Sequence, residues 1–216
     1  MTKAKECEAP RPPTGSPRPD YEAGDYFTAA ECQLEQRALL QKLRHANRQL
    51  HGCGIVCGMW VVPAGDPKEP WAVQVCPGYA VGPYGDEIQV TAATTINLKD
   101  FLWSMPQLIS TRDFRRIPYL VIRYDESTDR TQAIPAVACK CTDPYYCDTR
   151  TVDSFRLGVL WKLTEQPFQE GVCGPESMPC PACPDSPWLV LARILLPGNN
   201  AVITAAMIDN DIRTAL

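Results

Sequence analysis

The stretch from Thr28 to Gly52 constrains the fold more than any other part of the chain, because it carries both the start and the stop signal of a long helix. Thr28 and Glu31 have the spacing of a capping box, in which each residue's side chain binds the other's backbone amide. Gly52 supplies the stop signal. We therefore predict a helix over residues 28 to 51, about six turns and roughly 33 Å long.

Within this helix the apolar and small residues form one stripe, which is typical of an amphipathic helix. They recur at steps of four, three, four, three and four, and Leu40 widens the stripe. Its members are Cys32, Gln36, Leu39, Leu43, Ala46 and Leu50. Another face is basic, and we expect it to be solvated; it carries Arg37, Lys42, Arg44 and Arg48.

After Gly52 the pattern changes to short β-rich runs separated by Gly, Pro and Asp. Strand candidates lie at residues 54–62, within 71–90 around a reversal at 83–86, and at 119–126, 154–163 and 188–196. A short helix is expected around Leu98 to Met105, and the last fifteen residues fit a strand or a helix. The predicted fold class is α+β: an extended arm, one long capped helix, then a mostly antiparallel β meander or sandwich with long Pro/Cys-rich loops.

Residues 1 to 26 hold five prolines and almost no large aliphatic side chain, so they cannot fold alone. Two interpretations stay open: a disordered tail, and an extended Pro-rich arm laid over its own domain or a neighbouring subunit. We predict an arm over 1–26 and a single α+β domain over 27–216.

Composition narrows the function classes. Twenty-one Lys and Arg against twenty-five Asp and Glu give a net charge of -4 without long blocks of one sign, which disfavours nucleic acid as a partner. The first residues lack the apolar core of a signal peptide, and no stretch approaches the ~18 apolar residues of a membrane span. We expect synthesis in the cytosol and no membrane span.

Eleven cysteines are unusual for a cytosolic chain. Two loops, about 137–150 and 172–186, hold most of the late ones, and Cys180 and Cys183 have the C-x2-C spacing of a zinc site. A structural zinc would be bound by four of six candidate ligands: Cys139, Cys141, Cys147, Cys173, Cys180 and Cys183. Disulfides and free packed thiols are the alternatives.

Both histidines and two more cysteines lie within residues 45 to 57. If extended, Cys53 and Cys57 would have Cα atoms about 13 Å apart, too far for a disulfide. We interpret the segment as a helix-to-strand junction whose thiols pack as small apolar residues. A thiol enzyme using Cys53 or Cys57 with His51 is the least favoured reading, and standard catalytic motifs are absent, so we expect no enzyme.

Residues 26 to 90 resemble a family of proteins encoded with phage-tail-like contractile injection systems. The resemblance lies in YFTAAECQLEQ, in RQLHGCGIVCGMWV and in PGYAVGPYGDEI. The family pattern is approximately Y-F-x-G-x-x-L-T-A-E-D-F, then L-H-N-R-x-L-H-G-x-G-V-V-C-G, then P-G-x-A-x-D-x-x-G-R-E-I. This chain departs from it at Ala46, at Cys53 and at Asp86, where the family has His, an aromatic or small residue, and Arg.

The resemblance implies a non-enzymatic structural or adaptor subunit of a contractile injection system or phage-tail-like particle, in its baseplate, cap or tail accessories. It implies partners among the other subunits, a ring or homo-oligomer, and a particle that is released or acts outside the cell. From the residues themselves, the alternative is a cytosolic zinc-stapled protein-binding module.

Overall fold

The structure is a computed structural model that describes residues 17–24, 28–102, 117–134, 145–161, 163, 183, 186–197 and 201–216, with the backbone alone at 130–134 and 145–149. The chain divides into two compact units, Met1–Leu43 and Arg44–Leu216. This division falls inside the long helix rather than after residue 26. The predicted division into an arm and a single domain therefore stays a prediction.

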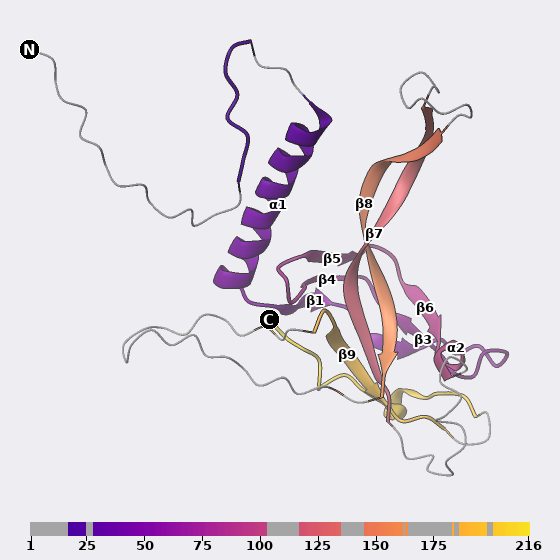
Figure 1. The fold of residues 1–216 in the computed structure, drawn as a ribbon. Helices are drawn as coiled ribbons and strands as arrows, with labels where there is room; N and C mark the ends of the chain where they lie inside the picture. The colour runs from indigo at the N-terminus through magenta and orange to yellow at the C-terminus, as the bar shows by residue number, and fades with distance from the viewer. Residues whose placement is uncertain are drawn as a thin grey trace, which may run out of the picture. The chain divides into compact units, whose positions relative to one another are not determined.

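The long helix α1 (Ala29–Leu50) follows the predicted bounds to within one residue at each end (Figure 1). The Thr28 amide donates to the Glu31 carboxylate at 3.0 Å, and the Glu31 amide donates to the Thr28 hydroxyl at 3.3 Å, so the predicted capping box is confirmed. At the other end Gly52 has φ of 83° and donates its amide to the Arg48 carbonyl at 3.2 Å. A left-handed glycine here ends the helix as predicted.

The described strands form three sheets, and every strand pair in them is antiparallel. One has the order β1-β4-β5 and another the order β2-β3-β6; the third has the order β10-β9-β7-β8. The bounds are β1 Gly54–Gly58, β2 Val61–Pro63, β3 Ala72–Val75, β4 Gly78–Val81, β5 Glu87–Val90, β6 Thr94–Asn97, β7 Tyr119–Ile134, β8 Tyr145–Leu160, β9 Leu189–Ile194 and β10 Ile208–Asp209. Short helices occur at α2 (Lys99–Leu102) and η2 (Ala205–Met207). One main helix with mostly antiparallel sheets agrees with the predicted α+β class.

The predicted strand over 54–62 is divided into β1 and β2 by Gly58 and Met59, both with positive φ. Met59 is fully buried, and its amide donates to the Pro77 carbonyl at 3.1 Å. This contact turns the chain from one sheet into the next. The reversal predicted at 83–86 is confirmed, because Gly82 donates to the Asp86 carbonyl at 2.7 Å across Gly85, whose φ is 84°.

Strands β7 and β8 pair over sixteen residues each, well beyond the predicted 119–126 and 154–163. Strand β9 joins β7 only at Tyr119–Ile122, so the rest of β7 has β8 as its one neighbour within the described sheet (Figure 1). Arg156 reaches Asp125 at 2.9 Å across this ribbon. Strand β8 also begins inside the 137–150 span expected to be a loop.

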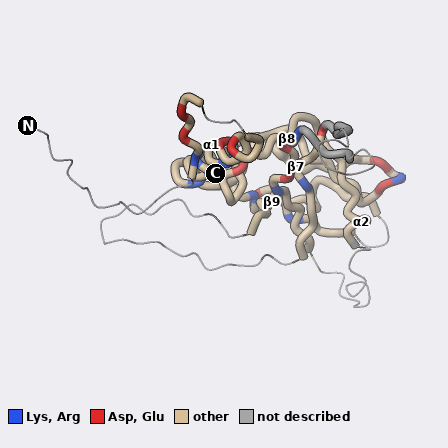
Figure 2. The backbone as a smooth tube through the Cα atoms, turned by 45° about the horizontal axis from the view of Figure 1, so that its top comes forward, with Lys and Arg blue, Asp and Glu red and all other residues tan. Residues whose placement is uncertain are grey.

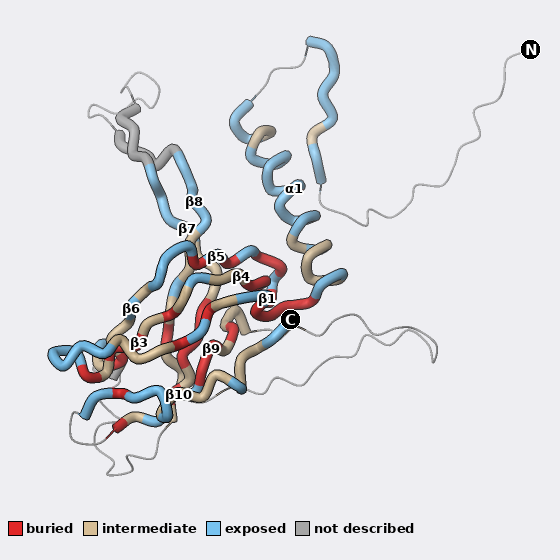
Figure 3. The backbone as a smooth tube through the Cα atoms, turned by 180° about the vertical axis from the view of Figure 1, so that it is seen from behind, coloured by how far each residue is buried: buried red, intermediate tan, exposed pale blue. Residues whose placement is uncertain are grey.

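The core lies where the three sheets meet in the second unit (Figure 3). Its fully buried side chains are mostly aliphatic and include Met59, Ile88, Leu98, Leu120, Ile122, Leu189, Leu191, Ile194 and Ile203. The C-terminal segment contacts strands of all three sheets. Asn210 exchanges hydrogen bonds of 3.0 and 3.1 Å with the Val61 backbone, while Thr214 accepts from the Ile55 amide at 2.7 Å and donates to the Val190 carbonyl at 3.1 Å. No described helix is long and apolar enough to cross a membrane.

Candidate docking surface

Helix α1 exposes most of its leucines. Leu39 is 62% exposed, Leu40 48%, Leu43 50% and Leu50 74%, whereas Ala38 is the buried residue of the helix. We call these four leucines the leucine seam. An amphipathic helix normally turns its apolar stripe toward its own core. Here the leucines of the stripe are exposed among the described residues, and an exposed apolar patch of this kind is typical of an interaction surface.

The last two turns of α1 are attached to the β4–β5 turn by polar contacts. Arg44 Nε lies 2.5 Å from Asp86 Oδ1, and the Asn47 side-chain amide donates to the Gly85 carbonyl at 3.1 Å. The expectation that Arg44 lies on a solvated face is therefore wrong. A single sequence gives no signal for this pair, because the two residues are far apart in the chain and charged helix residues are usually solvated.

The Arg44 guanidinium also faces strand β7. It lies 3.7 Å from the Glu126 carboxylate and 5.3 Å from the centroid of the Tyr124 ring. The Tyr124 hydroxyl in turn donates to Asp153 at 2.6 Å and to Glu126 at 3.0 Å. The Arg44 guanidinium thus faces two carboxylates, and Tyr124 adds a third, Asp153. We call Arg44, Asp86, Tyr124, Glu126 and Asp153 the arginine cluster.

Burial shifts the pKa of two members of the arginine cluster, Asp86 and Tyr124. It raises the pKa of Asp86 above its ordinary value, against the opposing effect of Arg44. Burial, followed by the hydrogen bonds to Asp153 and Glu126, raises the pKa of Tyr124, which therefore stays a neutral donor. The cluster has no nucleophile placed beside a base, and among the described residues no group of three His, Cys, Asp or Glu side chains is suited to a metal ion. Its chemistry suits a structural fastening.

The contacts of Arg44 lie on a different side of the helix from three of the four leucines. At 100° per residue, Leu39, Leu43 and Leu50 fall within an arc of about 40°, and Arg44 points about 120° away from its centre. These three leucines therefore lie on a different side of the helix from Arg44, whereas Leu40, about 80° from their centre, lies within about 40° of it. Acidic and basic positions are interspersed along the described chain, without a long run of one charge (Figure 2).

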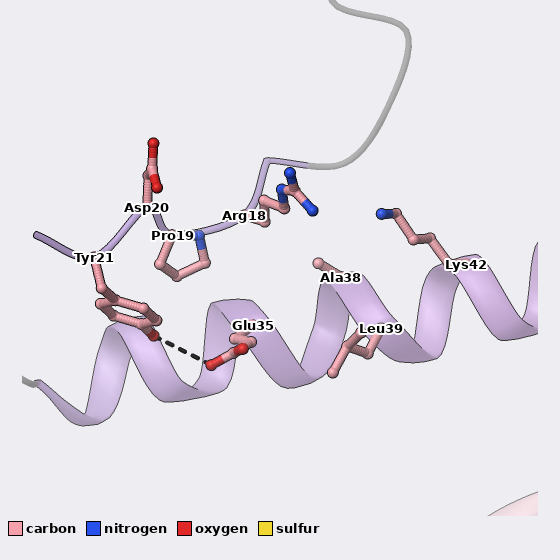
Figure 4. A pocket seen from close by; sticks show the side chains of 8 residues that line it. All are labelled: Arg18, Pro19, Asp20, Tyr21, Glu35, Ala38, Leu39 and Lys42. Carbon is pink, nitrogen blue, oxygen red and sulfur yellow. Dashed lines mark hydrogen bonds between the residues drawn. The ribbon is translucent and has the colours of Figure 1, made fainter.

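In the first unit, residues 17–24 lie along the first turns of α1 (Figure 4). They enclose a pocket of about 360 Å³, and the Tyr21 hydroxyl donates to the Glu35 carboxylate at 3.3 Å. The pocket is lined by Arg18, Pro19, Asp20, Tyr21, Glu35, Ala38, Leu39 and Lys42. The segment covers the side of the helix that bears Ala38, and Leu39 at its border stays exposed. The rest of the predicted arm, residues 1–16 and 25–26, lies outside the described residues.

The structure describes two of the six predicted metal ligands, Cys147 and Cys183. Cys183 is bonded to Cys53, with their Cα atoms 5.7 Å apart. Cys147 lies in β8 opposite Gln132, where only the backbone is described. Cys139, Cys141, Cys173 and Cys180 lie outside the described residues, so the candidate zinc set stays a prediction.

We interpret the thiols of Cys53 and Cys57 as small apolar residues packed at the helix-to-strand junction, and the structure differs on both. Cys53 is disulfide-bonded rather than a free packed thiol, and Cys57 is exposed rather than packed. A bonded Cys53 cannot act as a nucleophile in this form. His45 and His51 are exposed as well. The predicted role of the segment as the place where helix passes to strand is confirmed by the end of α1 and the start of β1.

Comparison with known proteins gives little beyond these observations. No protein-family model matches the chain, and no curated protein matches it. One solved structure, titled "Crystal structure of TssK", aligns with a TM-score of 0.45 and 9% identity. The alignment covers 90% of this chain and 41% of that one, so the chain spans less than half the length of the protein it matches. A likeness at this level supports no functional argument.

Proposed function

We propose that the chain is a non-enzymatic structural or adaptor subunit of a contractile injection system or phage-tail-like particle, and that it docks there through α1. The observation that carries the proposal is the exposed leucine seam on a helix whose end is fastened by the arginine cluster. The family resemblance over residues 26 to 90 includes this helix, whereas Asp86, which holds its end, is a departure from the family pattern.

The energetics of the seam favour an assembled state. Burying a leucine side chain fully contributes about 1.5–3 kcal/mol, and the exposed seam leaves much of that free energy unused in the isolated chain. Because the helix is already capped and fastened, a partner would meet a pre-formed surface, and little conformational entropy would be lost on binding. These properties suit a subunit that becomes fully buried only within a larger particle.

Within the particle, the subunit would have a definite position and definite partners. The subunit would be made in the cytosol and built into the baseplate, the cap or a tail accessory, with other particle subunits as its partners. The Pro-rich N-terminal segment would add a second contact, since an extended segment covers more surface than its own core provides.

Particle incorporation tests this function. Tail-like particles purified by sedimentation from cells that express the tagged chain should contain it in fixed proportion to the tube subunits. A variant lacking residues 1 to 26 should fold, as circular dichroism would show, but should be depleted from the particles. Absence of the full chain from every particle fraction would refute the proposed function, whereas full incorporation of the shortened variant would refute only the role of the arm.

A further inference from the structure

The spacing of the stripe on α1 is that of a coiled coil. Steps of four and three alternate without a break over six positions, which gives a strict repeat of 3.5 residues. The a positions are Gln36, Leu43 and Leu50, and the d positions are Cys32, Leu39 and Ala46. A helix that packs on a globular core follows a period of 3.6 and a wider apolar face. The narrow seam of α1 instead matches the surface that another helix requires.

In the described part of the chain none of these six positions is buried: Gln36, Leu39, Leu43 and Leu50 are exposed, and Cys32 and Ala46 are half-buried. Arg44 falls at a b position, so the arginine cluster holds α1 by residues outside the seam. Leu40 occupies an e position and widens the apolar surface toward a partner. Among the described residues, the a positions and Leu39 are therefore accessible, although Leu39 and the g residues Glu35 and Lys42 also border the pocket under residues 17–24.

We propose that the occupant of this seam is α1 of a second copy of the chain, packed as a parallel, in-register coiled coil. The inference rests on the proposed function for the particle in which the copies meet. In this register Leu39, Leu43 and Leu50 each meet the same residue of the other copy. Ala46 lets the two helices approach closely, and Gln36 meets Gln36, so two side-chain amides can bond to each other at one a layer.

The flanking residues favour the parallel arrangement. Glu35 at g would face Leu40 of the second copy, and Lys42 at g would face Asn47, so no like charges meet. In an antiparallel pair with full overlap, Lys42 would lie opposite Lys42. Gln36 would then lie against Ala46 and lose its amide partner. Both differences disfavour the antiparallel register.

The seam is short, so the pairing should depend on concentration. Twenty-two residues make about three heptads, and helices of this length are marginal without tertiary support. The capping box and the arginine cluster provide such support before the copies meet. We expect the purified chain to pass from monomer to dimer as its concentration rises, and the high local concentration in a particle to complete the pairing.

The native Cys32 makes the register measurable. It is a free thiol at a d position, so in a parallel, in-register pair it would lie beside Cys32 of the other copy. Mild oxidation of the full chain should give a covalent dimer whose linked peptide contains Cys32 from both copies, identified by mass spectrometry. Cys32→Ser should remove this link.

A matched pair of leucine variants tests the seam. Leu43→Asp changes an a position, and Leu34→Asp changes an f position on the same helix. Sedimentation velocity should show loss of the dimer and of the Cys32 link in Leu43→Asp, and retention of both in Leu34→Asp. Circular dichroism should show both variants folded, because neither leucine is buried.

Three outcomes would overturn the inference: a monomer at every concentration, a dimer that survives Leu43→Asp, or a dimer that never links through Cys32. A monomer that still enters particles, and does so only with an intact Leu43, would mean that the seam binds a different subunit; the pairing of copies would then fail while the proposed function stands. A Cys32-linked dimer that never enters a particle would support the pairing and refute the proposed function.

Discussion

Arg44 Nε lies 2.5 Å from Asp86 Oδ1, and this ion pair joins the end of α1 to the turn between β4 and β5. Asp86 is buried, while Arg44 keeps a third of its side chain exposed. The contact links a helix fixed by its own sequence signals to a turn fixed by Gly85. It therefore sets how the last turns of the candidate docking helix are held.

Removing the guanidinium should destabilise the fold, because Asp86 would remain buried without its cation. We expect Arg44→Ala to lower the free energy of unfolding by about 1–3 kcal/mol. Arg37→Ala, which removes an exposed arginine of the same helix, should change it by less than about 0.5 kcal/mol. Urea unfolding of the two variants measures the difference, and equal stabilities would show that the ion pair contributes nothing.

The raised pKa of Asp86 predicts a pH dependence of stability. The folded chain takes up a proton at this carboxyl at higher pH than the unfolded chain does. In the unfolded chain the pKa of this carboxyl is near 3.8. The folded state therefore binds more protons in the window above 3.8, and the contribution of Asp86 to the free energy of unfolding falls as pH rises through that window. Above the folded pKa it is constant.

The side chain of Asp86→Asn cannot titrate, so this variant should lack the pH-dependent contribution of Asp86 to the free energy of unfolding. Unfolding free energies of both proteins, measured by urea from about pH 4 to about pH 7, should show the wild type losing stability relative to Asp86→Asn as pH rises. A constant difference between the two proteins over that range would contradict the raised pKa.

Gly85 should tolerate no side chain, for two separate reasons. Its φ is 84°, and an added Cβ would overlap the backbone carbonyl group of Arg44. Gly65 has a similar φ of 73°, and a Cβ added there would meet nothing within 4 Å. Gly65→Ala therefore measures the cost of the backbone conformation alone. We expect Gly65→Ala to cost about 1–2 kcal/mol and Gly85→Ala roughly 1–3 kcal/mol more. Thermal unfolding compares them, and an equal cost would mean that the helix end does not approach Gly85 so closely.

The disulfide between Cys53 and Cys183 predicts a distinct pattern of thiol reactivity. Without reductant, Cys57 should be alkylated readily because it is exposed, and Cys53 and Cys183 should be alkylated only after reduction. Because the bond closes a loop of 130 residues, reduction should lower stability by up to roughly 5 kcal/mol. A double Cys53→Ser, Cys183→Ser variant should be insensitive to reductant.

Metal analysis distinguishes this disulfide from the predicted zinc set. About one zinc per chain, lost on changing Cys183 to Ser, would show that Cys183 is a zinc ligand and would contradict the disulfide. A protein without zinc in which Cys53 and Cys183 are recovered in one linked peptide would support it.

Local signals in the sequence predicted local structure well. The capping box at Thr28, the stop at Gly52 and the reversal at 83–86 each depend on a few neighbouring residues, and each is present in the structure. The outer halves of β7 and β8 were missed because their polar residues show no alternation. Their hydrogen bonds come from the partner strand, which a local pattern does not report.

The candidate site depended on long-range facts that no local pattern contains. The stripe on α1 was visible, but its exposure depends on what the rest of the chain covers, and the chain covers Ala38 instead. The Arg44–Asp86 pair joins positions 42 residues apart, and Cys53 meets Cys183 across 130. Such pairings follow from topology, so a single sequence with no register information could not predict them.

The most direct test of docking through α1 is cross-linking mass spectrometry on intact tail-like particles. Lys42 is exposed at the edge of the leucine seam, so an amine-reactive reagent would report what lies against it. We predict links from Lys42 to another subunit, including a Lys42–Lys42 link that only two copies of the chain can form. Particles that contain the chain but in which Lys42 links only to lysines of the same chain would contradict docking through this helix.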